Sequence, residues 1–221
     1  MGYFFKQSFF YTKLLRSYRI TYIFISLVIG NTTSHLAKAE WLFQANAEFY
    51  IPTATTINQD GKTAKISNDQ GGGFSAIWGY RFLQHIDTTL EYVFLHHHSH
   101  IKSGGLFNHL PVKNFYVSHH LALANIGYHF GRYAGLKNFG IDIGTGFGAE
   151  ITNGGVGLYH ASQFVMPFKL AVNYQINEIF TMGIYSRYYF PIGDNGTANA
   201  KPASIASVGA FSAGLSLGLN F

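Results

Sequence analysis

The chain has 221 residues, of which 48% are hydrophobic, 17% aromatic and only 11% charged, and it contains no cysteine. Its formal net charge is +5. Five of the 15 basic residues lie before position 40, namely Lys6, Lys13, Arg16, Arg19 and Lys38. Without them, 10 basic residues stand against 10 acidic ones. This balance argues against a nucleic-acid partner, and no disulfide supports the fold.

Residues 1–39 are predicted to be a cleaved secretory signal peptide. Basic residues precede an apolar run from Ile20 to Gly30, and Ala37-Lys38-Ala39 has the small-x-small pattern of a signal-peptidase site. A membrane-spanning helix, the alternative, needs about 20 apolar residues, and this run is shorter. Residues 40–221 are then expected to form one domain.

Eight segments of residues 40–221 alternate between apolar and polar or small side chains, and a period of two predicts β-strands. In chain order they are Trp41 to Ile51, Phe74 to Phe82, Ile86 to His96, Tyr116 to Phe130, Phe139 to Ile151, Phe164 to Gln175, Thr181 to Phe190 and Gly209 to Phe221. Pro167 lies inside the sixth segment, where we expect a bulge or an early end to pairing, because proline donates no backbone hydrogen bond.

The polar faces of these segments separate a lipid-facing barrel from a soluble sandwich or a lipocalin-like barrel. In the last segment this face is Gly, Ser and Asn with one Ala, and it has no Lys or Glu. Soluble domains average about 25% charged residues, because their strands face water. Small polar side chains instead suit the inside of a narrow barrel whose apolar face meets lipid.

The connections between the segments alternate between short and long. The short ones are Leu83 to His85, Gly131 to Asn138 and Asn177 to Ile179; the long ones are Thr53 to Gly72, His97 to Lys113, Asn153 to Ser162 and Gly193 to Val208. The sequence therefore predicts an all-β fold: an eight-stranded antiparallel up-and-down transmembrane β-barrel with short periplasmic turns and four longer external loops.

Two stretches carry a resemblance to a known family. They are Gly71 to Phe94, GGGFSAIWGYRFLQHIDTTLEYVF, and Ser118 to Ile151, in which Ala-Asn-x-x-Tyr-x-Phe leads through a Gly-rich turn into a Gly-alternating strand. They resemble hairpins of the small bacterial outer-membrane barrels of the opacity-protein and OmpA-transmembrane type. The resemblance implies the bacterial outer membrane as the location, with lipid and lipopolysaccharide as surroundings. It also implies that Phe221 is the terminal aromatic that the barrel-insertion machinery recognises.

Charged residues on the polar faces form the first candidate site: Glu48, Arg81, Asp87, Glu91, Asp142, Glu150, Lys169 and Arg187. They can line a small pore or form ion pairs that fill the lumen. We expect the second arrangement, because an eight-stranded barrel is just wide enough for its own side chains. The OmpA-type resemblance also implies such a plug, so any conduction should be weak.

The second candidate site is a group of histidines around the second external loop. Imidazoles that converge bind Zn, Cu or Ni, and the candidate metal ligands are His97, His98, His100 and His109. Adjacent residues of a strand point to opposite faces, so they can share one ion only after the chain has left the strand. The alternative is a solvated rim that faces lipopolysaccharide. No other cofactor is expected.

A lipid A-modifying hydrolase is a further alternative. Outer-membrane lipid A deacylases are eight-stranded barrels with a His-x-Ser pair and a following Glu, and His97-His98-Ser99 resembles the pair. No acidic residue lies between Glu91 and Asp142, however, so the third member of that pattern is missing. We therefore expect a protein that is not an enzyme.

The function predicted from the sequence is that of a noncatalytic outer-membrane surface protein, active in adhesion, antigenic display or envelope structure through its external loops. The expected contact surfaces are the His-rich second loop and the first loop, which carries Asp60, Lys62, Lys65 and Asp69. A host surface ligand is the partner that this interpretation implies. A narrow passive porin is the main alternative function.

Overall fold

The computed structural model describes residues 40–53, 55–59, 62–82, 85–103, 114–130, 138–154, 159–192 and 209–221. The chain divides into two units, Met1–Lys38 and Ala39–Phe221. The predicted signal peptide lies outside the described residues and stays a prediction. Within the described residues, no helix is long and apolar enough to cross a membrane.

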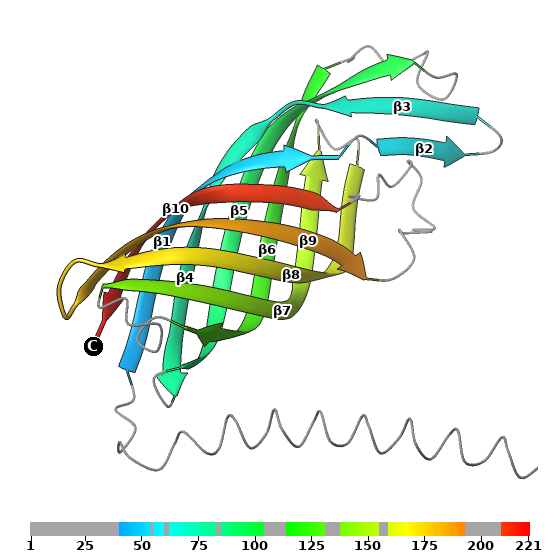
Figure 1. Cartoon of the computed structure of the whole chain (residues 1–221). Helices are drawn as coiled ribbons and strands as arrows, with labels where there is room; N and C mark the ends of the chain where they lie inside the picture. Colours follow the sequence, from blue (N-terminus) through cyan, green and yellow to red (C-terminus); the bar gives the residue numbers. More distant parts are fainter. Residues whose placement is uncertain are drawn as a thin grey trace, which may run out of the picture. The chain divides into compact units, whose positions relative to one another are not determined.

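Eight antiparallel strands form a closed barrel (Figure 1). They are β1 (Glu40–Pro52), β4 (Gly71–Phe82), β5 (Ile86–Ser103), β6 (Asn114–His129), β7 (Phe139–Gly154), β8 (Tyr159–Gln175), β9 (Phe180–Ile192) and β10 (Ala210–Asn220). Each strand pairs with its neighbours along the chain, and the pairing of β1 with β10 closes the ring. The predicted eight-stranded up-and-down barrel is confirmed.

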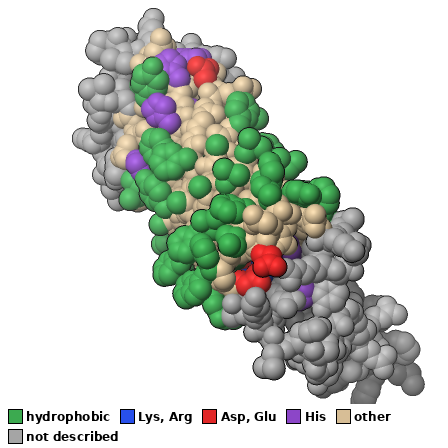
Figure 2. All heavy atoms as spheres, turned by 90° about the vertical axis from the view of Figure 1, so that its left-hand side faces the viewer, with side chains coloured by type: hydrophobic (Ala, Val, Ile, Leu, Met, Phe, Trp, Pro, Cys, Tyr) green, Lys and Arg blue, Asp and Glu red, His purple; other side chains and the backbone are tan. Residues whose placement is uncertain are grey.

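The barrel exterior is a belt of large apolar side chains. Outward residues alternate with buried ones along each strand, so that Leu217 is 66% exposed while Ser216 is 3% exposed. Figure 2 shows hydrophobic side chains over much of one face of the molecule. An apolar surface this extensive is unfavourable in water and is the lipid-facing surface of a transmembrane barrel. The predicted inward and outward faces of the strands are therefore correct.

The two ends of the barrel differ. Backbone hydrogen bonds of 3.0 Å join Trp41 and Phe221 in both directions, so the first and last strands meet at one end. The short connections between strands lie at this same end, which is periplasmic in barrels of this topology. The opposite end, called the external end below, carries the connections β1–β4, β5–β6, β7–β8 and β9–β10. The long external loop predicted from Asn153 to Ser162 is wrong, because β7 continues to Gly154 and β8 begins at Tyr159, so only residues 155–158 connect them.

An additional hairpin stands at the external end. It consists of β2 (Thr55–Gln59) and β3 (Lys62–Asn68), and β3 pairs with the part of β5 that continues beyond the end of β4. In Figure 1 the hairpin projects beyond the barrel, away from the C-terminus. The sequence predicts a loop over residues 53–72, because this segment is polar and lacks the apolar row of a membrane strand. The hairpin is therefore a correction to that expectation.

The prediction of a bulge or an early end to pairing at Pro167 is wrong. Strand β8 continues through Pro167, and its pairing with β9 is unbroken there. The ladder with β7 has a gap between Thr145↔Phe168 and Gly148↔Val165, but the register is the same on both sides. The Thr145 hydroxyl donates a hydrogen bond of 3.0 Å to the Pro167 carbonyl beside this gap. The missing proline donor therefore interrupts the ladder only locally.

Candidate functional site

The structure places all eight predicted interior charges on the inner side of the barrel. They do not form one continuous set of contacts. Instead they lie at three levels between the periplasmic and the external end, and each level has its own partners.

The middle level is organised around Arg187, which is 1% exposed. Its Nη2 donates to Glu91 Oε1 at 2.7 Å, and its Nη1 lies 3.5 Å from Glu48 Oε1. Nη1 also donates to the Tyr189 hydroxyl at 2.7 Å, and that hydroxyl donates to Glu48 Oε2 at 3.3 Å. One guanidinium thus joins strands β1, β5 and β9 across the lumen.

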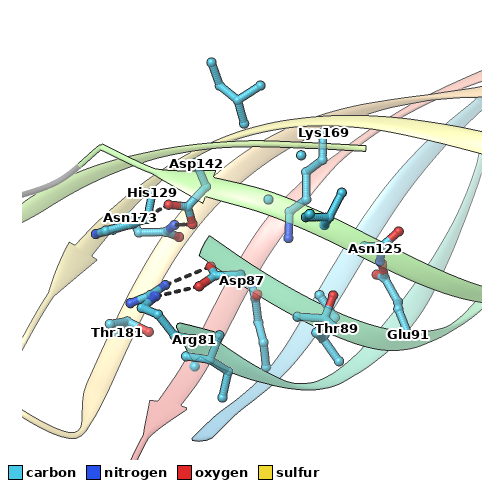
Figure 3. A pocket seen from close by; sticks show the side chains of 18 of the residues that line it. Arg81, Asp87, Thr89, Glu91, Asn125, His129, Asp142, Lys169, Asn173 and Thr181 are labelled. Atoms are coloured by element: carbon cyan, nitrogen blue, oxygen red, sulfur yellow. Dashed lines mark hydrogen bonds and ion pairs between the residues drawn. The ribbon is translucent and has the colours of Figure 1, made fainter. Parts of the chain in front are cut away.

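The periplasmic level surrounds a cavity of about 110 Å³, which has room for several water molecules. Arg81 forms a two-bond ion pair with Asp87, with distances of 2.6 and 3.0 Å (Figure 3). On the facing wall, Asp142 accepts hydrogen bonds from His129 and Asn173. Arg81, Asp87 and Asp142 are thus paired within the barrel wall and face the cavity. Lys169 lines the same cavity, and its Nζ lies 5.1 Å from the centroid of the Tyr185 ring.

Above the middle level, the lumen is filled by an apolar plug that the strand pattern of the sequence does not predict. Its residues are at most 5% exposed and come from β1, β5, β6, β8, β9 and β10: Tyr50, Val93, Leu95, Leu121, Leu123, Val165, Tyr189 and Ala210. The signal for it was present, because residues 92–95 and 121–124 are apolar on both faces. A continuous apolar run does not show which of its residues face the lumen.

The external level is a buried polar cluster that borders the plug, with Glu150 opposite Leu121 in the β6–β7 ladder. His119, 3% exposed, pairs with Glu150 Oε1 through Nδ1 at 2.6 Å. Gln163 donates to the second oxygen of Glu150 at 2.7 Å. The His97 ring stacks on His119 with centroids 5.1 Å apart, and the Tyr50 ring contacts both. Glu150 is therefore paired close to the external end, away from the other predicted interior charges.

The predicted metal ligands are divided between the two faces of β5. His97 is 4% exposed and lies inside the barrel. His98 and His100 lie on the outer face, where both approach Asp69 of the first external loop. His109 lies outside the described residues. Strand β5 runs to Ser103, so the alternation of side chains separates His97 from the other two.

Comparisons with known proteins are informative at the level of structure. No protein-family model and no curated protein matches the sequence. Neisserial surface protein A is similar in structure, with a TM-score of 0.54 and 13% identity over 83% of this chain and 99% of its own. OprG from Pseudomonas aeruginosa has a TM-score of 0.53 and 14% identity, over 83% of this chain and 96% of its own. The outer membrane protein AlkL, solved in DMPC lipid bilayers, has a TM-score of 0.51 and 13% identity, over 86% of this chain and 93% of its own.

The chain has the fold of the small outer-membrane β-barrels. Together with the apolar belt, this fold places it in the bacterial outer membrane, as the sequence predicted. At identities of 13–14%, this similarity establishes the fold and does not establish the function.

In this outer-membrane barrel the His-x-Ser pair is not arranged around an open site. Ser99 is fully buried, and its hydroxyl donates to Asn68 Oδ1 of β3 at 2.8 Å. The histidine of the pair, His97, lies on the same inner face, where it is 4% exposed and its ring stacks on His119. The Ser99 hydroxyl therefore ties the first external loop to β5, which is a structural role.

Proposed function

We propose that the protein is a noncatalytic outer-membrane surface protein, whose closed barrel is an anchor that displays its external loops. The observation that supports this function most is the apolar plug. It lies above the cavity of the periplasmic end and fills the lumen with side chains that are at most 5% exposed. Adhesion, antigenic display or envelope structure are roles that such an anchor serves through its loops.

The plug also weighs against the narrow porin. Ions cross a barrel through a continuous polar path, and charged or polar side chains must line it. Here the cavity near Arg81 is bounded above by the Arg187 cluster and then by Leu95 and Leu121, each 2% exposed. Water reaching the cavity from the periplasmic end therefore meets an apolar barrier before the external end.

Planar-bilayer recording tests this closure. We expect the wild-type protein to show no steady single-channel current, because the plug excludes water. The Leu95→Ala/Leu121→Ala variant should show more frequent current events, since it removes apolar volume from the plug. Heat-modifiable migration in gels checks that both proteins are folded. A steady wild-type current that the double variant leaves unchanged would contradict the proposal.

We also propose that Phe221 is the assembly signal of the barrel. Its side chain is 62% exposed at the periplasmic end, and its ring contacts Phe43 with centroids 6.3 Å apart. The ring is thus presented on the outer surface at the end where β1 and β10 meet.

Deleting Phe221 is expected to lower the amount of folded protein in outer-membrane fractions, measured by heat-modifiable migration. Replacing it with Trp, which keeps an outward aromatic ring, should preserve the yield. Equal yields for the deletion and the wild type would show that insertion does not depend on this residue.

A further inference from the structure

Three potential metal ligands converge on the outer wall at the external end. Asp69 follows β3, and His98 and His100 are successive outward residues of β5. His98 Nδ1 lies 3.4 Å from Asp69 Oδ2, and His100 Nε2 lies 3.2 Å from Asp69 Oδ1. One donor atom of each residue lies within 4.8 Å of the other two.

The three side chains are close enough to share one ion. Zinc binds imidazole nitrogen at about 2.0–2.1 Å and carboxylate oxygen at about 2.0–2.2 Å, so two ligands of a tetrahedral site lie about 3.3 Å apart. The two imidazoles approach different oxygens of Asp69, His98 at 3.4 Å from Oδ2 and His100 at 3.2 Å from Oδ1. One donor atom of each residue lies within 4.8 Å of the others, so small rotations of the side chains bring all three to the separation that one ion requires. Two imidazoles and a carboxylate are also the ligand types that zinc and neighbouring transition metals prefer.

The backbone holds the three ligands in register. The Asp69 amide donates to the His98 carbonyl at 2.8 Å, and Asn68 pairs with Ser99 in the β3–β5 ladder. The side chains of Asn68 and Ser99 are joined as well, and Asn68 Nδ2 donates to the Thr53 carbonyl at 2.7 Å. These hydrogen bonds bring the backbone of Asp69 beside the backbone of His98 and His100, and a shared ion would strengthen this contact.

The three ligands are open to the aqueous phase. The outward row of β5 is apolar at Leu90, Tyr92 and Phe94 and then changes to histidine, so the ligands lie beyond the lipid-facing belt. The side chains of Asp69, His98 and His100 are 46%, 35% and 32% exposed. Figure 2 shows histidine and acidic side chains together at the upper end of the visible surface. A dissolved ion can reach the ligands, and water can complete its coordination.

We propose that Asp69, His98 and His100 bind one divalent transition-metal ion of the zinc class. The ion clips the first external loop to β5 and so fixes the β2–β3 hairpin on the barrel wall. This site differs from the one predicted from the sequence, because Asp69 takes the place of the buried His97. It also goes beyond the proposed function, which requires no metal.

Binding is tested on the full-length protein in nanodiscs, with Zn²⁺ followed by calorimetry and Co²⁺ followed by visible absorption. We expect saturable 1:1 binding of Zn²⁺ and a Co²⁺ spectrum typical of four-coordinate nitrogen and oxygen ligation. Asp69→Asn, His98→Ala and His100→Ala should each abolish saturable binding. His96→Ala and His120→Ala are matched controls on the same outer surface, and they should bind like the wild type.

A second measurement separates ligation from general loop disorder. Hydrogen exchange of residues 62–69 should slow when Zn²⁺ is added to the wild type and to the His96→Ala control, but not to Asp69→Asn. Heat-modifiable migration confirms that each variant is folded. The absence of saturable binding by the wild type would overturn the proposal and leave Asp69 as an ordinary ion-pair partner of the histidines. Retained 1:1 binding by Asp69→Asn would also overturn it.

Discussion

Replacing Leu217 with Arg is expected to lower the free energy of unfolding in lipid by about 2–4 kcal/mol, the cost of a cation at mid-membrane on the outer face of a barrel. Leu217 is 66% exposed and pairs with Ala45 and Met182 near the middle of the apolar belt. Urea unfolding of the protein in lipid vesicles measures the loss. The large effect follows from the outward direction of this side chain.

Two control variants test direction and depth separately. Ser216→Ala changes the inward neighbour, which is 3% exposed, and should cost less than about 1 kcal/mol because it removes one hydroxyl. Leu219→Arg lies two positions closer to the periplasmic end and should cost less than Leu217→Arg, since the cost of a cation falls toward the interface. If Ser216→Ala were the most damaging of the three, the assignment of the lipid-facing side would be wrong.

Replacing Arg187 with Met should cost about 3–5 kcal/mol of stability, because it leaves buried carboxylates without their cation. The guanidinium is 2.7 Å from Glu91 and 3.5 Å from Glu48, and all three side chains are at most 1% exposed. Unfolding in urea, monitored by tryptophan fluorescence, gives the change in free energy. This is the largest loss that we expect from a change inside the lumen.

A double variant distinguishes a charge effect from a packing effect. Arg187→Met combined with Glu91→Gln should recover part of the lost stability, because one of the two uncompensated charges is gone. Arg81→Met is the comparison at the periplasmic level, where Asp87 remains beside the wet cavity, and should cost less. If the double variant were as unstable as the sum of its single changes, the Arg187 cluster would act through packing alone.

The sequence predicted the barrel well, because one physical pattern determines it. In β1, β7 and β10 every second side chain must meet lipid, so the period of two is nearly unbroken. The same alternation assigned the eight interior charges to the inner side. It also correctly assigned Gly214, Ser216 and Gly218 to the inner side, where a side chain at Gly214 would meet the ring of Tyr185 on the neighbouring strand β9.

The Asp69 site could not be predicted from the sequence, because it depends on contacts between distant segments. Asp69 reaches His98 and His100 only because the β2–β3 hairpin docks on β5, and polar residues of this hairpin give no periodic signal. The apolar plug was missed for a different reason. Val93 and Leu121 lie within runs that are apolar on both faces, so periodicity cannot separate lumen from lipid there.

The Arg187 cluster has a consequence for the order of folding. Its contacts join residues far apart in the chain: 96 positions separate Arg187 from Glu91, and 141 separate Tyr189 from Glu48. Contacts this distant in sequence form only after the intervening chain has been ordered, at a cost in loop entropy. A partly assembled sheet that lacks β1 or β9 therefore lacks these contacts, and the Arg187 cluster is complete only when the ring closes. Closure of the ring and completion of the cluster are in this way a single late event, which disfavours stable half-formed barrels in the membrane.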